Sequence, residues 1–157
     1  MKAVRKAFGN DIFPNGQIDR RKLAGIVFKD RKKLRQLEKI LHPEVKKIIK
    51  EEIKRYRKSK KKGIVILDVP LLFEVGLEKN VDYIVVVKAS RDVQLKRAAQ
   101  NLWLTKSEAL RRIKAQLPLG VKSRLADIII NNQGSKKQVE KEVEKVWQRL
   151  QSRINNQ

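Results

Sequence analysis

Three short apolar runs, rich in β-branched residues, constrain the fold of this chain most. They are Ile64-Val65-Ile66-Leu67-Asp68, Tyr83-Ile84-Val85-Val86-Val87 and Ile128-Ile129-Ile130. None of them alternates with polar residues, and unalternating runs are typical of strands in parallel sheets that are covered on both faces. Because helical patterns separate the runs, we expect a doubly wound α/β fold, in which ligands bind beyond the carboxyl ends of the strands.

Capping residues predict where the helices begin. Asp19 and Asp30 precede amphipathic stretches, Thr105 with Glu108 forms a capping box, and Ser135 with Gln138 repeats that pattern. Pro43 suits the first position of a helix, so we expect one helix to end near Leu41 and another to run from Pro43 to about Tyr56. The full set of expected features is a helix tail at 2–8, a turn at 14–16, helices at 20–28, 31–41 and 43–56, a basic loop at 57–63, and helices starting at Ser90, Thr105 (closed by Pro118) and Ser135.

The charge balance predicts an anionic partner without naming it. The 157 residues include 39 Lys and Arg against 17 Asp and Glu, for a net charge of +22. Nucleic acid, acidic lipid and phosphorylated small molecules all satisfy this demand, and a solvated surface also accounts for any single basic cluster. The length predicts one domain, and the sequence has no cysteine. No apolar stretch reaches membrane-spanning length and the first residues do not resemble a signal peptide, so we expect a cytoplasmic protein with no membrane partner.

The segment after the first run carries the most specific chemistry. Asp68-Val69-Pro70-Leu71-Leu72-Phe73-Glu74 takes an acid from a predicted buried strand directly into a proline-fixed apolar turn. A carboxylate in that place faces the ligand crevice, where it can orient a hydroxyl group for phosphoryl transfer. The alternative is that Asp68 simply caps the turn.

Four motifs together resemble those of dephospho-CoA kinases in order and spacing. They are Leu41-His42-Pro43, the stretch Leu67 to Glu74, the stretch Arg111 to Gln116, and Ala126-Asp127 followed by Asn132-Gln133-Gly134-Ser135. The resemblance spans essentially the whole chain, and the segment Leu71 to Glu74 is its most specific part. It implies a P-loop-kinase-like α/β domain, with a helical acceptor region at 1–62, a sheet core at 63–92 and 126–157, and lid helices at 93–125.

The resemblance also implies an activity and a set of site residues. The activity is the transfer of a phosphoryl group from ATP, with Mg²⁺, to the ribose 3'-hydroxyl of dephospho-CoA. Asp68 is the candidate catalytic acid, and no metal ligand is assigned. The implied acceptor-binding residues are His42, Lys46, Pro70, Leu71, Phe73 and Glu74, and the implied ATP-binding residues are Arg97, Arg112, Asn132 and Gly134. The alternatives are a helix-boundary histidine at 42, exposed helix arginines at 97 and 112, and a tight turn at 132–134.

Two features depart from the family pattern. The sequence contains no G-x-x-x-x-G-K-[ST] loop, whose backbone N–H groups and lysine hold the phosphates of ATP. We therefore expect that the chain is truncated before Met1, that the first two family strands are missing, and that the sheet has a gap between the strands at 64–68 and 83–87. Between the expected lid helices the family commonly has Arg-Asp-Gly, whereas this chain has Asn101-Leu102-Trp103.

Three hypotheses follow for function. The first is a dephospho-CoA kinase that is not active as this chain alone and that receives its P-loop from a separate chain or from a longer reading frame. The second is a non-catalytic module that binds CoA-like nucleotides or nucleic acid. Basic residues are scattered over many helices with no aromatic stacking platform, which does not favour nucleic acid as the main partner. The third is a nonfunctional remnant of a truncated gene.

Overall fold

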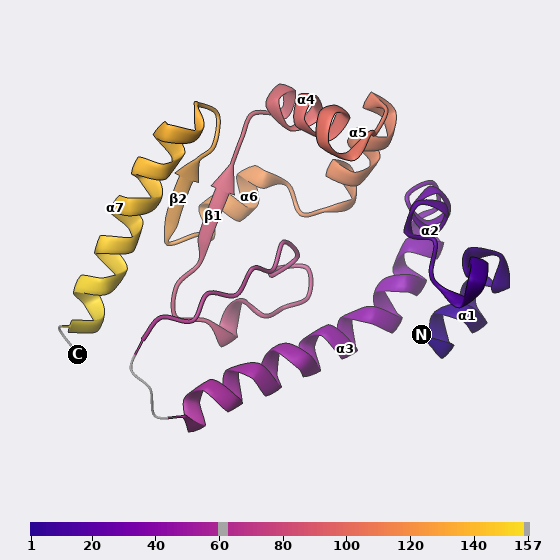
Figure 1. The fold of residues 1–157 in the computed structure, drawn as a ribbon, viewed down its shortest axis with the longest axis horizontal. Helices are drawn as coiled ribbons and strands as arrows, with labels where there is room; N and C mark the ends of the chain where they lie inside the picture. Colours follow the sequence, from indigo (N-terminus) through magenta and orange to yellow (C-terminus); the bar gives the residue numbers. More distant parts are fainter. Residues whose placement is uncertain (60–62, 156–157) are drawn as a thin grey trace. The chain divides into compact units, whose positions relative to one another are not determined.

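The computed structural model describes residues 1–59 and 63–155. The chain forms two compact units, Met1–Lys60 and Lys61–Gln157 (Figure 1). The expected basic loop at 57–63 falls partly outside the described residues at Lys60, Lys61 and Lys62, and its first two residues belong to a helix.

The first unit is helical. It consists of α1 (Lys2–Phe8), two 3₁₀ turns (Asn10–Ile12 and Pro14–Gly16), α2 (Arg20–Val27) and α3 (Arg31–Lys58). The side chain of Asp19 caps α2 and that of Asp30 caps α3, as the sequence predicts. The core of this unit is built from the buried residues Val4, Ile12, Phe13, Leu23 and Val27.

The predicted break at His42-Pro43 is wrong. A single helix, α3, runs through Pro43 from Arg31 to Lys58. Proline removes one helical N–H and leaves the carbonyl of Lys39 without its usual partner. Pro43 and Lys39 are both exposed, so water can hydrogen-bond that carbonyl and the helix continues.

The second unit contains a small parallel sheet. Strands β1 (Val85–Lys88) and β2 (Ile128–Asn131) pair in parallel, with Val86 opposite Ile129. The carboxylate of Asp127 accepts a hydrogen bond from the backbone N–H of Ile84 and so fixes the start of the pairing. The arrows in Figure 1 point the same way, so both strands deliver the chain to the same edge of the sheet.

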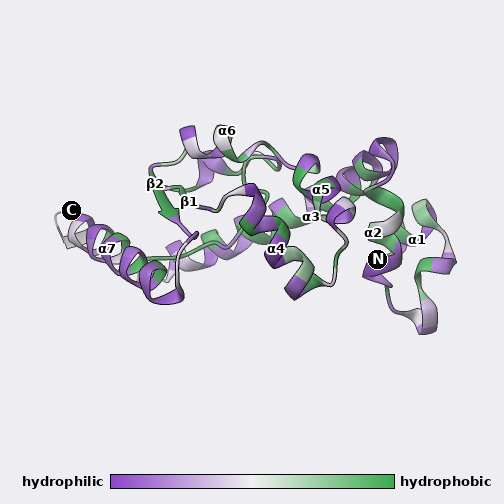
Figure 2. Ribbon diagram, turned by 90° about the horizontal axis from the view of Figure 1, so that it is seen from above, coloured by the Kyte–Doolittle hydropathy of each residue, from purple (hydrophilic) through white to green (hydrophobic). Residues whose placement is uncertain are grey.

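Helices lie against the sheet and beyond the carboxyl ends of its strands. They are α4 (Arg91–Leu102), α5 (Lys106–Ala115), α6 (Leu119–Arg124) and α7 (Lys136–Asn155). Helix α6 packs against β1 and α7 against β2, while α4 and α5 pack against each other. Apolar and polar residues are interspersed along α7 at helical spacing (Figure 2). This gives α7 the amphipathic pattern expected of a helix that covers one side of a sheet.

Two local predictions at the helix starts are confirmed, and one helix was not predicted. Thr105 and Glu108 form the capping box of α5, and the Ser135 amide donates to the Gln138 side chain at the start of α7. The helix after Thr105 ends at Ala115, and Pro118 then caps the short helix α6 instead of closing α5. A proline suits both the end of one helix and the first turn of the next, so the sequence alone did not separate the two roles.

The strand predicted at Ile64–Asp68 is wrong for the part of the chain that the structure describes. Residues 64–69 are neither helix nor strand, and the two paired strands are β1 and β2. An apolar run becomes a strand only where a neighbouring strand accepts and donates its backbone hydrogen bonds, and none lies beside this run. Ile66 is 75% exposed as a result.

The helices within residues 1–59 and 63–155 do not meet the requirements of a membrane span. None of them is at once long and apolar enough to cross a bilayer.

Candidate functional site

The edge where β1 and β2 end carries a shallow, open pocket. After β2 the chain passes through Asn132, Gln133 and Gly134 into α7, and after β1 it passes through Ala89 and Ser90 into α4. A pocket of about 580 Å³ lies here, with Arg97 from α4, Asn132 and Gly134 from the loop, and Lys136 and Val139 from the first turns of α7 among its lining residues. Three residues that the sequence predicted for ATP binding therefore share one pocket.

A hydrogen bond ties the two sides of this pocket together. The Arg97 guanidinium donates to the main-chain carbonyl of Asn132 at 2.9 Å. Arg97 is half-buried, so the bond is screened less by water than an exposed one. It fixes the position of the loop relative to α4 and leaves the remaining N–H donors of the guanidinium available to a ligand.

Gly134 leaves room for the Gln138 side chain in the cap of α7. A Cβ at this position would lie 2.1 Å from the side-chain oxygen of Gln138, which accepts the hydrogen bond from the Ser135 amide. Any larger residue would push the Gln138 side chain away from that amide. The small residue thus keeps both the pocket rim and the helix cap in place.

Four of the residues predicted to bind the acceptor, Pro70, Leu71, Phe73 and Glu74, lie in a tight turn at 70–76. Hydrogen bonds from the amides of Val75 to Leu71, Gly76 to Phe73 and Leu77 to Leu72 close the turn. Val75 and Leu77 anchor it because their side chains are buried, whereas Leu71 and Phe73 are partly buried. Pro70, Leu71, Phe73 and Glu74 therefore occupy one rigid structure, as their sequence proximity requires.

Asp68 precedes this turn on the extended segment. Its side chain is exposed, and it has no hydrogen-bond partner or ion pair among the described residues. It does not cap the turn, because no hydrogen bond joins it to an amide of residues 71–76, and the amide of Leu72 donates to the carbonyl of Val69. The carboxylate of Asp68 is therefore open to a ligand.

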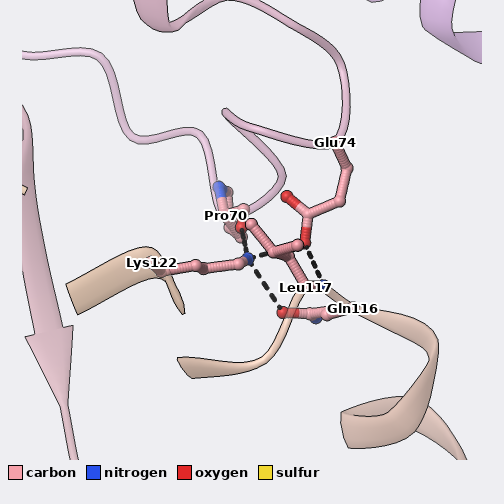
Figure 3. A network of polar contacts seen from close by, with 5 residues as sticks. All are labelled: Pro70, Glu74, Gln116, Leu117 and Lys122. Atoms are coloured by element: carbon pink, nitrogen blue, oxygen red, sulfur yellow. Dashed lines mark hydrogen bonds and ion pairs between the residues drawn. The ribbon is translucent and has the colours of Figure 1, made fainter. Parts of the chain in front are cut away.

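Glu74 does not point into solvent, and its partner was not predicted. Its Oε1 atom lies 2.7 Å from the buried Nζ of Lys122 and accepts a hydrogen bond from the amide of Leu117 at 2.8 Å (Figure 3). Burial raises the pKa of Glu74, but the hydrogen bonds from Lys122 and Leu117 outweigh it and bring the pKa below its ordinary value. Sequence reasoning missed Lys122 because a lysine in a short basic helix carries no sign of burial.

The remaining predicted residues lie elsewhere. His42 and Lys46 stand one turn apart on α3 in the first unit, and both are half-buried. Arg112 is half-buried in α5 and does not line the pocket at the strand ends. Among residues 1–59 and 63–153, no group of three or more His, Cys, Asp or Glu side chains could hold a metal ion.

Comparison with known proteins decides the family. The family model described as dephospho-CoA kinase matches residues 1–138. The chain belongs to the dephospho-CoA kinase family. Dephospho-CoA kinases are also its relatives among characterised sequences: that of Lactobacillus johnsonii is 39% identical over 150 residues, covering 95% of this chain and 75% of the relative. That of Carboxydothermus hydrogenoformans is 47% identical over 135 residues, covering 84% of this chain and 64% of the relative.

Solved structures agree with this membership. A crystal structure from Thermus thermophilus matches with a TM-score of 0.70 and 32% identity, covering 95% of this chain and 75% of that one. The dephospho-CoA kinase from Campylobacter jejuni matches with a TM-score of 0.61 and 28% identity, covering 94% and 73%. The chain thus spans about two thirds to three quarters of the length of these relatives and solved structures.

Proposed function

We propose that this chain supplies the acceptor-binding turn, the lid and the adenine-binding side of a dephospho-CoA kinase. The reaction is the transfer of the γ-phosphoryl group of ATP to the ribose 3'-hydroxyl of dephospho-CoA, which gives coenzyme A. The observation that carries the proposal is the meeting of Arg97, Asn132 and Gly134 in one pocket at the carboxyl ends of β1 and β2, in a chain of this family. That edge is where α/β proteins of this kind bind ligands.

The division of labour follows the family resemblance. In this proposal the region 1–62 is the helical acceptor region, 93–125 is the lid, and 63–92 with 126–157 is the core of a doubly wound sheet. The turn at 70–76 binds dephospho-CoA, and the acceptor-binding role that the family resemblance implies for His42 and Lys46 on α3 stays a prediction. The open carboxylate of Asp68 accepts a hydrogen bond from the 3'-hydroxyl and orients it for attack.

Between them, the pocket and the lid arginines offer contacts to adenine and to phosphate charge. Asn132 and the backbone of the loop can hydrogen-bond the polar edge of adenine, and Val139 offers an apolar contact to its ring. Arg97, with Arg112 on the other lid helix, can neutralise charge on the transferring phosphate. The glycine-rich loop that would hold the β- and γ-phosphates is absent from the 157 residues.

In this proposal, the strand that carries the phosphate-binding loop docks on unpaired backbone edges of this chain. The outer edge of β1 is unpaired in the described part of the chain, and its Val87 is 55% exposed. The extended segment at 64–69 is also unpaired. A strand that carries the P-loop would satisfy the backbone groups of both. It comes from the same polypeptide beyond these residues or from a separate chain, and without it we expect no transfer.

Reconstitution tests this function. The chain is mixed with a fragment of a relative that carries a strand followed by G-x-x-x-x-G-K-[ST], and coenzyme A is measured by mass spectrometry with ATP, Mg²⁺ and dephospho-CoA present. We expect product from the mixture and none from either part alone, and none when the loop lysine of the fragment is replaced by alanine. A well-folded mixture that makes no product would contradict the proposal.

A second candidate function follows from the net charge of +22. In that case the chain binds CoA-like nucleotides or nucleic acid without turnover. Salt separates the two binding modes, because non-specific binding to a polyanion weakens steeply as the salt concentration rises. Preference for dephospho-CoA over a generic oligonucleotide at 0.3 M salt would favour the acceptor site.

A further inference from the structure

Lys122 is a buried cation whose donors are all used. The residue is 8% exposed, and it lies in the short helix α6. Its Nζ atom lies 2.7 Å from Glu74 Oε1, 3.0 Å from the carbonyl of Pro70 and 3.4 Å from Gln116 Oε1 (Figure 3). An ammonium has three N–H donors, and three acceptors surround this one.

The partners of Lys122 come from two different segments. Pro70 and Glu74 belong to the turn at 70–76, whereas Gln116 and Leu117 belong to the connection that follows α5. The Leu117 amide donates to the same Glu74 oxygen that Lys122 contacts. One ammonium and one carboxylate therefore join main-chain atoms of the turn to main-chain atoms at the end of the helix pair α4–α5.

Stability alone is a weak reason for this network. A buried ion pair loses much of its Coulomb attraction to desolvation, and well-packed apolar residues of similar size often do as well. The second carboxylate oxygen of Glu74 is buried and has no hydrogen-bond partner, which is a further cost. An apolar pair could not form the directional hydrogen bonds that Lys122 and Glu74 make to the carbonyl of Pro70 and the amide of Leu117.

We propose that Lys122 and Glu74 are positioning residues that couple the lid helices to the acceptor turn. The inference rests on the proposed function only for the ligands of the turn and of the helices; the mechanical coupling itself does not depend on it. The network makes the turn that carries Leu71 and Phe73 follow the base of α5 when the lid moves. Glu74 then acts through the turn, because its carboxylate is occupied by Lys122 and Leu117 and does not touch the acceptor.

The absence of cysteine from the sequence makes a direct test available. Spin labels on Lys79→Cys, just after the turn, and Lys114→Cys, on α5, report the distance between turn and lid. Both positions are exposed. A control pair on the exposed residues Asp82→Cys and Lys141→Cys reports a region outside the network. We expect a narrow distribution for the test pair that becomes at least twofold broader with Lys122→Met, while the control pair is unchanged.

A double variant guards against simple unfolding. Lys122→Met alone leaves the Glu74 charge buried, whereas Glu74→Met with Lys122→Met removes both charges and retains apolar packing. We expect the control distribution to stay narrow in both variants and the test distribution to be broad in both. A test distribution as narrow as that of the parent in either variant would overturn the coupling, and so would a control pair that broadens in both.

A titration with ligand tests this inference separately from the proposed function. Titration with dephospho-CoA is expected to show at least fivefold weaker binding for the double variant than for the parent. Equal affinities with a broadened test pair would overturn the link between the network and the acceptor. A parent chain that does not bind dephospho-CoA would contradict the proposed function, and the label distances would still decide the coupling.

Discussion

The guanidinium of Arg97 in α4 reaches the main-chain carbonyl of Asn132, beyond the end of β2, at 2.9 Å. The two residues are far apart in sequence, and the parallel pairing of β1 with β2 brings their segments to one edge of the sheet. This contact defines the rim of the candidate nucleotide pocket, and it makes the first prediction specific.

Arg97→Ala should weaken the binding of ATP about tenfold, because a hydrogen bond to a charged group contributes about 1.5 to 3 kcal/mol and part of that fixes the loop. Fluorescence or calorimetric titration with ATP measures the effect. Arg91→Ala is the matched control, since it removes the same charge from the exposed start of the same helix. Equal losses for both variants would mean that net charge, and not the pocket, binds the nucleotide.

Glu74→Gln should make the unfolding free energy less dependent on pH below about pH 4.5. The pKa of Glu74 is lowered in the folded chain, so its contribution is fully present above the ordinary value of 4.5 and is lost as the pH falls through the folded pKa. Urea unfolding between pH 7 and pH 3 should show the parent about 1 to 3 kcal/mol more stable at pH 7, with the gap narrowing in acid. A gap that stays constant with pH would contradict the ion pair.

Trp103→Gly should stabilise the chain by up to about 1 kcal/mol, because Trp103 ends α4 in the left-handed conformation that glycine adopts without strain. The ring is 83% exposed, so little burial is lost. Trp103→Ala is the control: it removes the ring and keeps the strain, and it should be nearly neutral in urea unfolding. Equal destabilisation by both variants would show that the ring contributes more than its conformation costs.

Thr105→Ala should destabilise the second unit by about 1 kcal/mol, because it removes the capping box at the start of α5. Thr105→Ser retains the hydroxyl that accepts the Glu108 amide and serves as the matched control. Thermal unfolding followed by circular dichroism measures both. An alanine variant as stable as the serine variant would show that the capping box does not stabilise the chain.

The capping boxes at Thr105 and Ser135 could be predicted because each is a local contact between residues three positions apart. The strands at 83–87 and 128–130 could be predicted from their β-branched apolar runs, but not their pairing, and burial alternates along both instead of covering both faces. The run at 64–68 has the same character but no neighbouring strand, and no local pattern reports the presence of a partner. Pro43 carries the same kind of ambiguity, since the cost of a proline inside a helix depends on whether the freed carbonyl meets water.

The residues of the candidate site also differ in whether the sequence could point to them. The resemblance to the family pointed to Arg97, Asn132 and Gly134, and their segments follow strands that end at one edge. Lys122 could not, because its burial depends on where the turn at 70–76 lies relative to α6, and that is set by tertiary packing. A single lysine among 39 basic residues gives no signal of such a position.

The most direct test of the account is to map the two ligands on the backbone amides by nuclear magnetic resonance at 0.3 M salt. The account predicts that ATP alone shifts the amides of Asn132, Gly134 and Lys136, and that dephospho-CoA alone shifts those of residues 71–74. Shifts from both ligands that spread over basic residues throughout the described part of the chain and vanish as salt is raised would contradict it.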